Sequence, residues 1–88
     1  MTRRPWRVDF ARRAERDMRR LDPPVQRRVF AALDRLAADD PSLDVLKLTG
    51  QDTWRLRVGD WRVIFERDEA IRVIGVVRVL PRGRAYDR

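Results

Sequence analysis

The sequence predicts an α+β fold in which a helical hairpin packs on one face of a small antiparallel sheet. Apolar residues recur at helical spacing through the first half of the chain, from Ala11 to Ala38. Apolar and charged residues alternate through the second half, from Trp54 to Leu80, which is typical of strands. A chain of 88 residues has room for one hydrophobic core. We therefore expect residues 1–88 to form a single domain of this class.

An N-terminal strand and two helices are expected first. Residues 6–10 alternate apolar and charged side chains, so this short strand buries one face. A helix over residues 11–21 follows, with its arginines on the solvent side. Asp22 is placed as an N-cap and Pro23 as the first residue of the next helix, where a missing N–H does no harm. That helix is predicted over 23–38, and the short connection makes the pair an αα-hairpin.

Three strands of an antiparallel meander make up the rest of the fold. They are expected at residues 54–58, 61–65 and 71–80. Gly59 and Asp60 form a two-residue hairpin turn with glycine first, and residues 67–70 form the second turn. The segment around Leu46, between the helices and the meander, is expected to be a loop. Pro81 is expected to stop the last strand.

The two-residue turn determines how the first two meander strands pair. It places Arg57 directly opposite Arg62, and these two share a face with Arg55. The opposite face is the predicted core face and carries Trp54, Leu56, Val58, Trp61, Val63 and Phe65. Like charges that face each other across a ladder cost about 0.2–1 kcal/mol, so an anionic partner would explain the alignment. The alternative is that exposed arginines spread apart in solvent or pair with Glu66 and Asp60.

The pairing of the third meander strand depends on its turn. A tight turn at Asp68 and Glu69 sets Arg62 opposite Gly75, whose missing side chain leaves open space for a substrate beside the guanidinium. An isolated strand glycine equally indicates a bulge or a twist. The same pairing puts an apolar row on the arginine face, formed by Val73, Val77 and Val79. A row of this kind indicates a protein interface.

The charge of the chain indicates an anionic partner. The formal net charge is +7, and Lys47 is the only lysine among 21 basic residues. Arginine binds phosphate through two parallel hydrogen bonds and stacks on bases, so an arginine-rich surface favours nucleic acid. A genomic GC bias would also enrich arginine over lysine, but it does not explain the excess of positive charge.

Histidine and cysteine, two residue types that often carry catalysis, are absent from the chain. The usual zinc ligands and the usual general base are therefore missing, and we expect neither a metal nor a cofactor. The chain also shows no secretion signal and no apolar run of membrane-spanning length. A cytoplasmic protein without membrane contact is expected.

Three segments of the chain resemble one protein superfamily. They are residues 48–50 (LTG), the hairpin 54–65 (WRLRVGDWRVIF) and the tail 81–86 (PRGRAY). With the order of strand, two helices and meander, they look like the RelE/ParE toxins of type II toxin–antitoxin systems. Resemblance to the RelE branch implies a ribosome-dependent, metal-independent endoribonuclease that cuts mRNA in the decoding site. It also implies an acidic antitoxin as partner, in a toxin–antitoxin hetero-oligomer.

The resemblance also implies roles for particular residues. The implied catalytic residues are Arg55, Arg57, Arg62, Arg82 and Tyr86, and the expected nucleic-acid contacts are Arg55, Arg57, Arg84 and Lys47. Because the pKa of arginine exceeds about 12, the guanidiniums are expected to stabilise the dianionic phosphorane formed by 2′-hydroxyl attack. Tyr86 would orient that hydroxyl, exchange a proton or stack on a base, or else be an ordinary tail aromatic. Pro81 occupies a position where many relatives have histidine or another polar residue.

Two other functions are compatible with these residues. The other branch of the superfamily poisons DNA gyrase on the same fold, and the arginine at position 62 recurs in both branches. Arg82 followed by Tyr86 favours the ribonuclease. The second alternative is a non-catalytic, arginine-rich module that binds nucleic acid or only an antitoxin.

Overall fold

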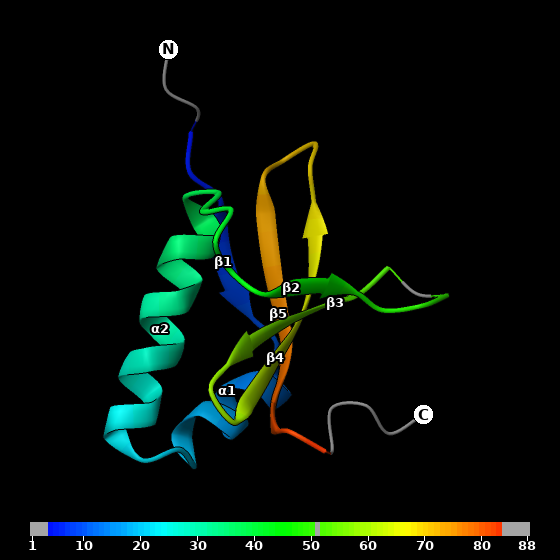
Figure 1. Ribbon diagram of the computed structural model, residues 1–88. Coiled ribbons are helices and arrows are strands. Elements are labelled where there is room, and N and C mark those ends of the chain that lie inside the picture. The colour runs from blue at the N-terminus through cyan, green and yellow to red at the C-terminus, as the bar shows by residue number, and fades with distance from the viewer. Residues whose placement is uncertain (1–3, 51, 84–88) are drawn as a thin grey trace.

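The computed structural model describes residues 4–50 and 52–83. Within them the chain forms two helices and one five-stranded mixed sheet (Figure 1). The elements are β1 (Arg7–Phe10), α1 (Arg12–Arg19), α2 (Pro23–Ala37), β2 (Val45–Lys47), β3 (Trp54–Val58), β4 (Trp61–Asp68) and β5 (Val73–Pro81). The strand order is β1-β5-β4-β3-β2, and the β1–β5 pair is parallel while the others are antiparallel. The predicted α+β class is confirmed.

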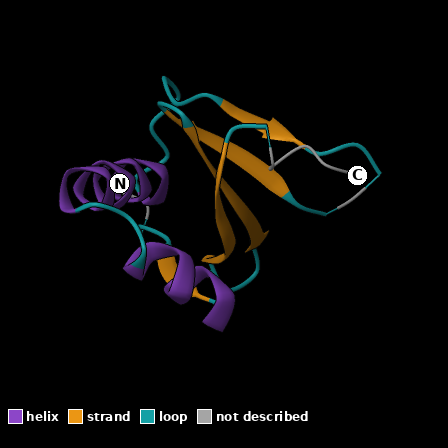
Figure 2. Ribbon diagram, turned by 90° about the horizontal axis from the view of Figure 1, so that it is seen from below, coloured by secondary structure: helices purple, strands orange, loops and turns teal. Residues whose placement is uncertain are grey.

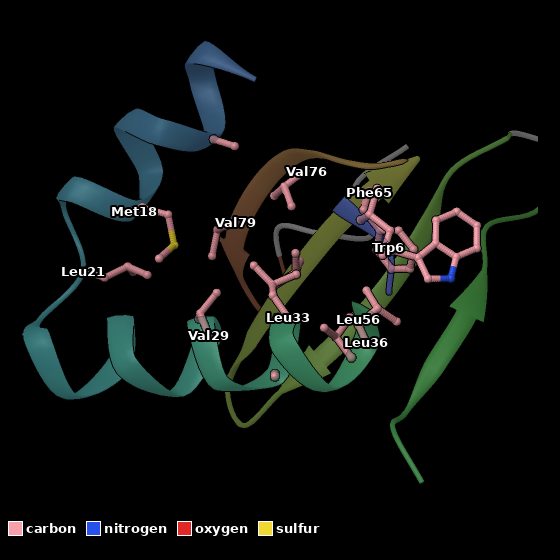
Figure 3. Close-up of a cluster of buried hydrophobic side chains, with 14 residues drawn as sticks. Trp6, Met18, Leu21, Val29, Leu33, Leu36, Leu56, Phe65, Val76 and Val79 are labelled. Atoms are coloured by element: carbon pink, nitrogen blue, oxygen red, sulfur yellow. The ribbon is translucent and has the colours of Figure 1, made fainter. Parts of the chain in front are cut away.

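Helix α2 begins at the predicted residue. Asp22 has an extended backbone (φ −62°, ψ 148°) and Pro23 occupies the first turn, but the Asp22 side chain makes no capping hydrogen bond. The Asp22 carbonyl accepts the first intrahelical bond, from the N–H of Gln26. One stripe of the helix is buried against the sheet, made of Val29, Ala32, Leu33 and Leu36 (Figure 3). Burial of this stripe, rather than a side-chain cap, therefore stabilises α2.

Helix α1 is shorter than predicted and lies beside β5. Its buried residues are Ala14 and Met18. Asp17 accepts hydrogen bonds from the Val79 N–H (2.8 Å) and from Nε and Nη2 of Arg78 (2.8 and 3.2 Å). Burial alone would raise the pKa of Asp17, but these bonds and the charge of Arg78 outweigh it, so the pKa is lowered. This carboxylate joins α1 to the edge of β5.

The core lies between the helices and one face of the sheet, and both helices are on that side (Figure 2). Leu56, Val63 and Phe65 are fully buried there, which confirms the predicted core face of the first hairpin. Each such side chain contributes about 1.5–3 kcal/mol by leaving water. Trp6 is also buried, and its indole N–H donates to Oδ1 of Asp39 at 3.0 Å.

The segment around Leu46 was expected to be a loop, and that expectation is wrong. Val45–Lys47 forms strand β2 at the edge of the sheet, with Leu46 opposite Arg55. Three residues are too few for an alternating pattern to be recognised in a sequence. The strand forms because β3 offers it backbone hydrogen-bond partners, which local sequence does not reveal.

The second hairpin has a longer connection than the tight turn considered above. Asp68 pairs with Val73, which leaves residues 69–72 in the turn. Oδ1 of Asp68 accepts hydrogen bonds from the N–H groups of residues 70 and 71 (3.0 and 3.4 Å). This turn, together with the bulge described next, sets Arg62 opposite Leu80, and the predicted pairing of Arg62 with Gly75 is wrong.

A bulge in the β4–β5 pair changes the facing of β5. Ile64 pairs with Arg78 while Phe65 pairs with Val76, so Val77 is an extra residue. Val79 is therefore turned into the core, where it is 2% exposed. Of the three valines expected to form an apolar row, Val73 lies on the predicted sheet face, the one that carries Arg62. The row itself does not form.

No helix within residues 4–50 and 52–83 is long and apolar enough to cross a membrane.

Candidate functional site

The first hairpin brings arginines to one end of the sheet. Arg57 lies directly opposite Arg62, as predicted, across the Gly59–Asp60 turn. Gly59 has a φ of 57°, the left-handed conformation that a glycine-first turn requires. The N–H of Arg82 donates to the Asp60 carbonyl at 2.8 Å. This bond brings the residue after β5 to the same turn, so three arginines from three parts of the chain meet here.

Arg62 is buried although it lies on the sheet face that points away from the helices. It is 6% exposed, and its Nη1 donates to the carbonyls of Gly59 (2.9 Å) and Trp61 (3.0 Å). Its Nε is buried and has no hydrogen-bond partner within the described part of the chain. An unsatisfied buried donor costs about 1–3 kcal/mol, so holding this guanidinium beneath the surface lowers the stability of the fold.

Asp44 binds both arginines of β3 and was not identified from the sequence. Its Oδ1 is 3.0 Å from Nη1 of Arg55, and its Oδ2 is 3.9 Å from Nη1 of Arg57. The Asp44 carbonyl also accepts the N–H of Arg57 at 3.0 Å. Asp44 directly precedes β2, so the unpredicted edge strand explains why this carboxylate escaped notice.

The clustered arginines differ in how far they reach solvent. The side chain of Arg55 is 10% exposed, whereas that of Arg57 is 53% exposed. Arg82 is 66% exposed and lies 3.9 Å from Asp60. Arg57 and Arg82 therefore offer accessible cations, while Arg55 and Arg62 add positive charge from beneath. Such an arrangement can bind phosphate and stabilise developing negative charge.

Lys47, another sequence-predicted residue, is not part of this group. Lys47 pairs with Trp54 at the other end of β3, and its Nζ lies 5.9 Å from the centre of the Trp54 ring. It lines a separate hollow of about 390 Å³ with Leu48, Thr49, Gly50 and Asp52. Arg84 and Tyr86 lie outside the described residues.

Carboxylates do not form a metal site in the described part of the chain. Residues 4–50 and 52–83 contain no group of three histidine, cysteine, aspartate or glutamate side chains that could hold an ion.

A family comparison accounts for this combination of fold and arginine end. Residues 8–86 match the profile of a family described as the ParE toxin of the type II toxin–antitoxin system parDE. The chain belongs to the RelE/ParE toxin superfamily. It is a toxin of the type II toxin–antitoxin kind, as its resemblance to this superfamily implied.

Solved structures of RelE toxins resemble this RelE/ParE toxin over nearly its whole length. The RelE of the archaeal RelE–RelB complex from Pyrococcus horikoshii OT3 is 31% identical, with a TM-score of 0.78 and coverage of 92% of this chain and 99% of the other. The corresponding chain of the RelB–RelE complex from Methanococcus jannaschii is 25% identical, with a TM-score of 0.74 and coverage of 91% and 96%. A mutant of E. coli RelE in the free state shares the fold, with 22% identity, a TM-score of 0.75 and coverage of 93% and 88%. A search of curated proteins gave no match.

Proposed function

We propose that this toxin is a ribosome-dependent endoribonuclease that cleaves mRNA in the cytoplasm without a metal ion. The arginine end carries the proposal, because Arg57 and Arg82 are accessible beside the buried Arg62. The 31% identity to an archaeal RelE supports assignment to the RelE branch.

The proposed cleavage is an internal transesterification. The 2′-oxygen forms a bond to phosphorus as its proton leaves, and the bond from phosphorus to the 5′-oxygen breaks as that oxygen gains a proton. Arg57 and Arg82 would bind the dianionic phosphorane, and the charges of Arg62 and Arg55 would strengthen the positive potential. Tyr86, outside the described residues, would orient the hydroxyl or exchange a proton.

An acidic antitoxin is the partner that we propose for the inactive state. The archaeal relatives from Pyrococcus horikoshii and Methanococcus jannaschii were solved as complexes of RelE with RelB. A chain with a net charge of +7 gains from a partner that neutralises its arginine end. The hetero-oligomer would dissociate to release active toxin.

Mapping mRNA 5′ ends in cells after induction tests the proposal. The wild-type toxin should produce new cuts within translated reading frames, and Arg62→Ala and Arg82→Ala should abolish or strongly reduce them. Arg12→Ala, an exposed arginine on α1, serves as the matched control and should cut like the wild type. Cuts that persist in the Arg62 and Arg82 variants would remove these arginines from the mechanism.

Gyrase poisoning is the second candidate, because the matching family profile is described as ParE. This function predicts DNA breaks and growth arrest while transcripts stay intact. Purified toxin would then inhibit supercoiling by gyrase in the absence of ribosomes. Normal supercoiling together with cleavage of mRNA on ribosomes would decide for the RelE activity.

A further inference from the structure

Charge is divided between two halves of the sheet face that points away from the helices, here called the helix-free face. Its side chains alternate along each strand with the buried core residues. One half is the arginine end, with Arg55, Arg57 and Arg62. The other half carries three carboxylates, Asp9, Glu66 and Asp68, and one arginine, Arg7, which is paired with Asp9 at 3.0 Å. This half is therefore acidic on balance. Ile64 lies between the two halves on β4, opposite Arg78, and Leu80 lies opposite Arg62.

An open hollow lies at the acidic half, and Glu66 and Asp68 line it. Asp9 of β1 and Glu66 of β4 both pair with Gly75, one from each side. A Cβ placed on Gly75 would meet no atom within 4 Å, so the space above it is empty. A hollow of about 500 Å³ lies here, lined by Asp52, Glu66, Arg67, Asp68, Ile71, Val73 and Gly75. The guanidinium of Arg67 stacks over the Trp54 ring, 4.0 Å from its centre, so the carboxylates outnumber the one cation at the hollow.

The walls of this hollow suit a long cationic side chain. Glu66 and Asp68 are exposed carboxylates, and Ile71 is 64% exposed. Lysine and arginine lay their methylene groups on apolar surface while the charged end meets a polar group. A side chain with an apolar stem and a positive end therefore matches both kinds of wall.

The distance between the two halves determines how far apart the opposite charges of a bound segment must be. Glu66 and Arg62 are four residues apart on β4, which corresponds to about 13 Å at about 3.3 Å per residue. An extended segment covers that distance with about four residues. A helical segment needs about nine residues at 1.5 Å per residue.

We propose that the helix-free face binds a bipolar segment of the antitoxin. A lysine or arginine of that segment enters the hollow beside Glu66, and its carboxylates neutralise Arg57 and Arg62. An apolar residue between them covers Ile64. This inference rests on the proposed antitoxin partner and adds the order of charges that the partner presents.

A protein segment fits this face better than a nucleic acid does. Phosphates repeat along a nucleic-acid strand, so any strand that crosses the whole face places negative charge beside Asp9 and Glu66. The acidic half therefore confines RNA to the arginine end. It also discriminates among partners, because a uniformly acidic segment is repelled there.

Short synthetic peptides test the inference without mRNA or ribosomes. Each peptide carries two adjacent glutamates, apolar residues and one lysine, and only the separation between lysine and glutamates varies; a reference peptide has no lysine. The wild-type toxin should bind best at a separation of about four residues or about nine. We expect affinity about tenfold above that of peptides with lysine next to the glutamates.

Charge reversal at the hollow provides the decisive comparison. In Asp9→Lys/Glu66→Lys the spacing preference should vanish, and peptides without lysine should bind best. Glu15→Lys/Asp34→Lys changes the net charge equally on exposed helical positions and should keep the preference. Thermal melts of each variant establish that it is folded.

Three results would overturn the inference. They are affinity that depends only on the number of glutamates, a preference unchanged by charge reversal at Asp9 and Glu66, and toxin dimers in sedimentation that cover this face. Because the peptides need no RNA, a spacing preference in a toxin that does not cleave mRNA would refute the ribonuclease alone. Cleavage without a spacing preference would refute only this inference.

Discussion

The carboxylate of Asp17 replaces a missing strand neighbour. β1 pairs with β5 only as far as Val76, and beyond that point the Val79 N–H at the strand edge donates to Asp17. Arg78 binds the same carboxylate through two nitrogens. A buried backbone N–H without a partner is costly, so Asp17 has a structural role that no sequence pattern indicated.

We predict that Asp17→Ala lowers the free energy of unfolding by about 2–4 kcal/mol, since it leaves a buried N–H and a largely buried guanidinium without their acceptor. Urea denaturation measures the change. Asp9→Asn is the matched control, because its pair with Arg7 is exposed at both ends, and it should change stability by less than about 1 kcal/mol. Equal effects of the two variants would contradict the role given to Asp17.

The free energy of unfolding should decrease as the pH is lowered below about 4, the range in which an unfolded aspartate takes up its proton. The pKa of Asp17 is lowered in the folded protein, and that of Asp40 is lowered to about 2 by hydrogen bonds from Ser42 and Arg35. The unfolded chain therefore binds more protons than the folded one between these values. Their contribution is complete above the unfolded pKa and is lost as pH falls through the folded pKa.

Denaturation curves between about pH 5 and pH 2 measure this dependence. Asp17→Asn should flatten the slope, since the amide does not titrate. A slope that stays unchanged would show that other carboxylates dominate acid unfolding.

Burial separates the roles of Arg55 and Arg57, which the sequence pattern treated alike. Arg57→Ala should weaken RNA binding and reduce the slope of log K against log salt concentration by about one. It should cost little stability, because this side chain is half exposed. Arg55→Ala should lower the free energy of unfolding by about 1–3 kcal/mol, since it removes a buried partner of Asp44. RNA titrations at several salt concentrations and urea melts of both variants test the split. A loss of stability in Arg57→Ala, or a loss of RNA binding without a loss of stability in Arg55→Ala, would contradict this division.

At the scale of elements, turn length decides how much of a hairpin can be predicted. The two-residue turn at Gly59–Asp60 leaves one register, and the predicted pairs from Val58↔Trp61 to Trp54↔Phe65 are all present. The core face of this hairpin and the meeting of Arg57 with Arg62 followed from that turn alone.

The second hairpin could not be predicted in the same way. Its four-residue connection permits several registers, and the bulge at Val77 depends on tertiary structure. That bulge lies where β5 passes from its pairing with β1, which ends at Val76, to its contact with Asp17. The local sequence does not indicate that β5 changes from pairing with β1 to contacting Asp17. The burial of Arg55 and Arg62 is likewise set by packing between distant segments.

Two glycines in the hairpins should respond differently to alanine. Gly59→Ala places a side chain at φ 57° and should cost about 1–2 kcal/mol, while its Cβ would meet only Arg28 Nη1 at an ordinary 3.8 Å. Gly75→Ala meets no atom within 4 Å and should be neutral or stabilise by up to about 1 kcal/mol. Thermal denaturation compares the two, and a larger loss for Gly75→Ala would contradict the assignment.

For the whole molecule, the net charge of +7 makes self-repulsion a term in stability. We predict that the free energy of unfolding rises as NaCl increases from about 0.01 M to about 0.1 M, over which the Debye length falls from about 30 Å to about 10 Å. Arg12→Gln/Arg16→Gln removes two exposed charges from α1 and should weaken this response. A decrease of stability with salt would show that ion pairs such as Arg78–Asp17 outweigh the repulsion.

The place of β5 in the sheet bears on how the chain acquires its structure during synthesis. β5 is nearly the last described segment to be translated, yet it lies between β1 and β4. Until Val73–Pro81 has been synthesised, β1 has no strand to pair with and Arg82 cannot reach the Asp60 turn. Pairing of such distant segments is slow and comes late in folding. The arginine end is therefore completed only after β5 has paired and Arg82 has reached the Asp60 turn, whereas Arg57 and Arg62 can come together as soon as the first hairpin forms.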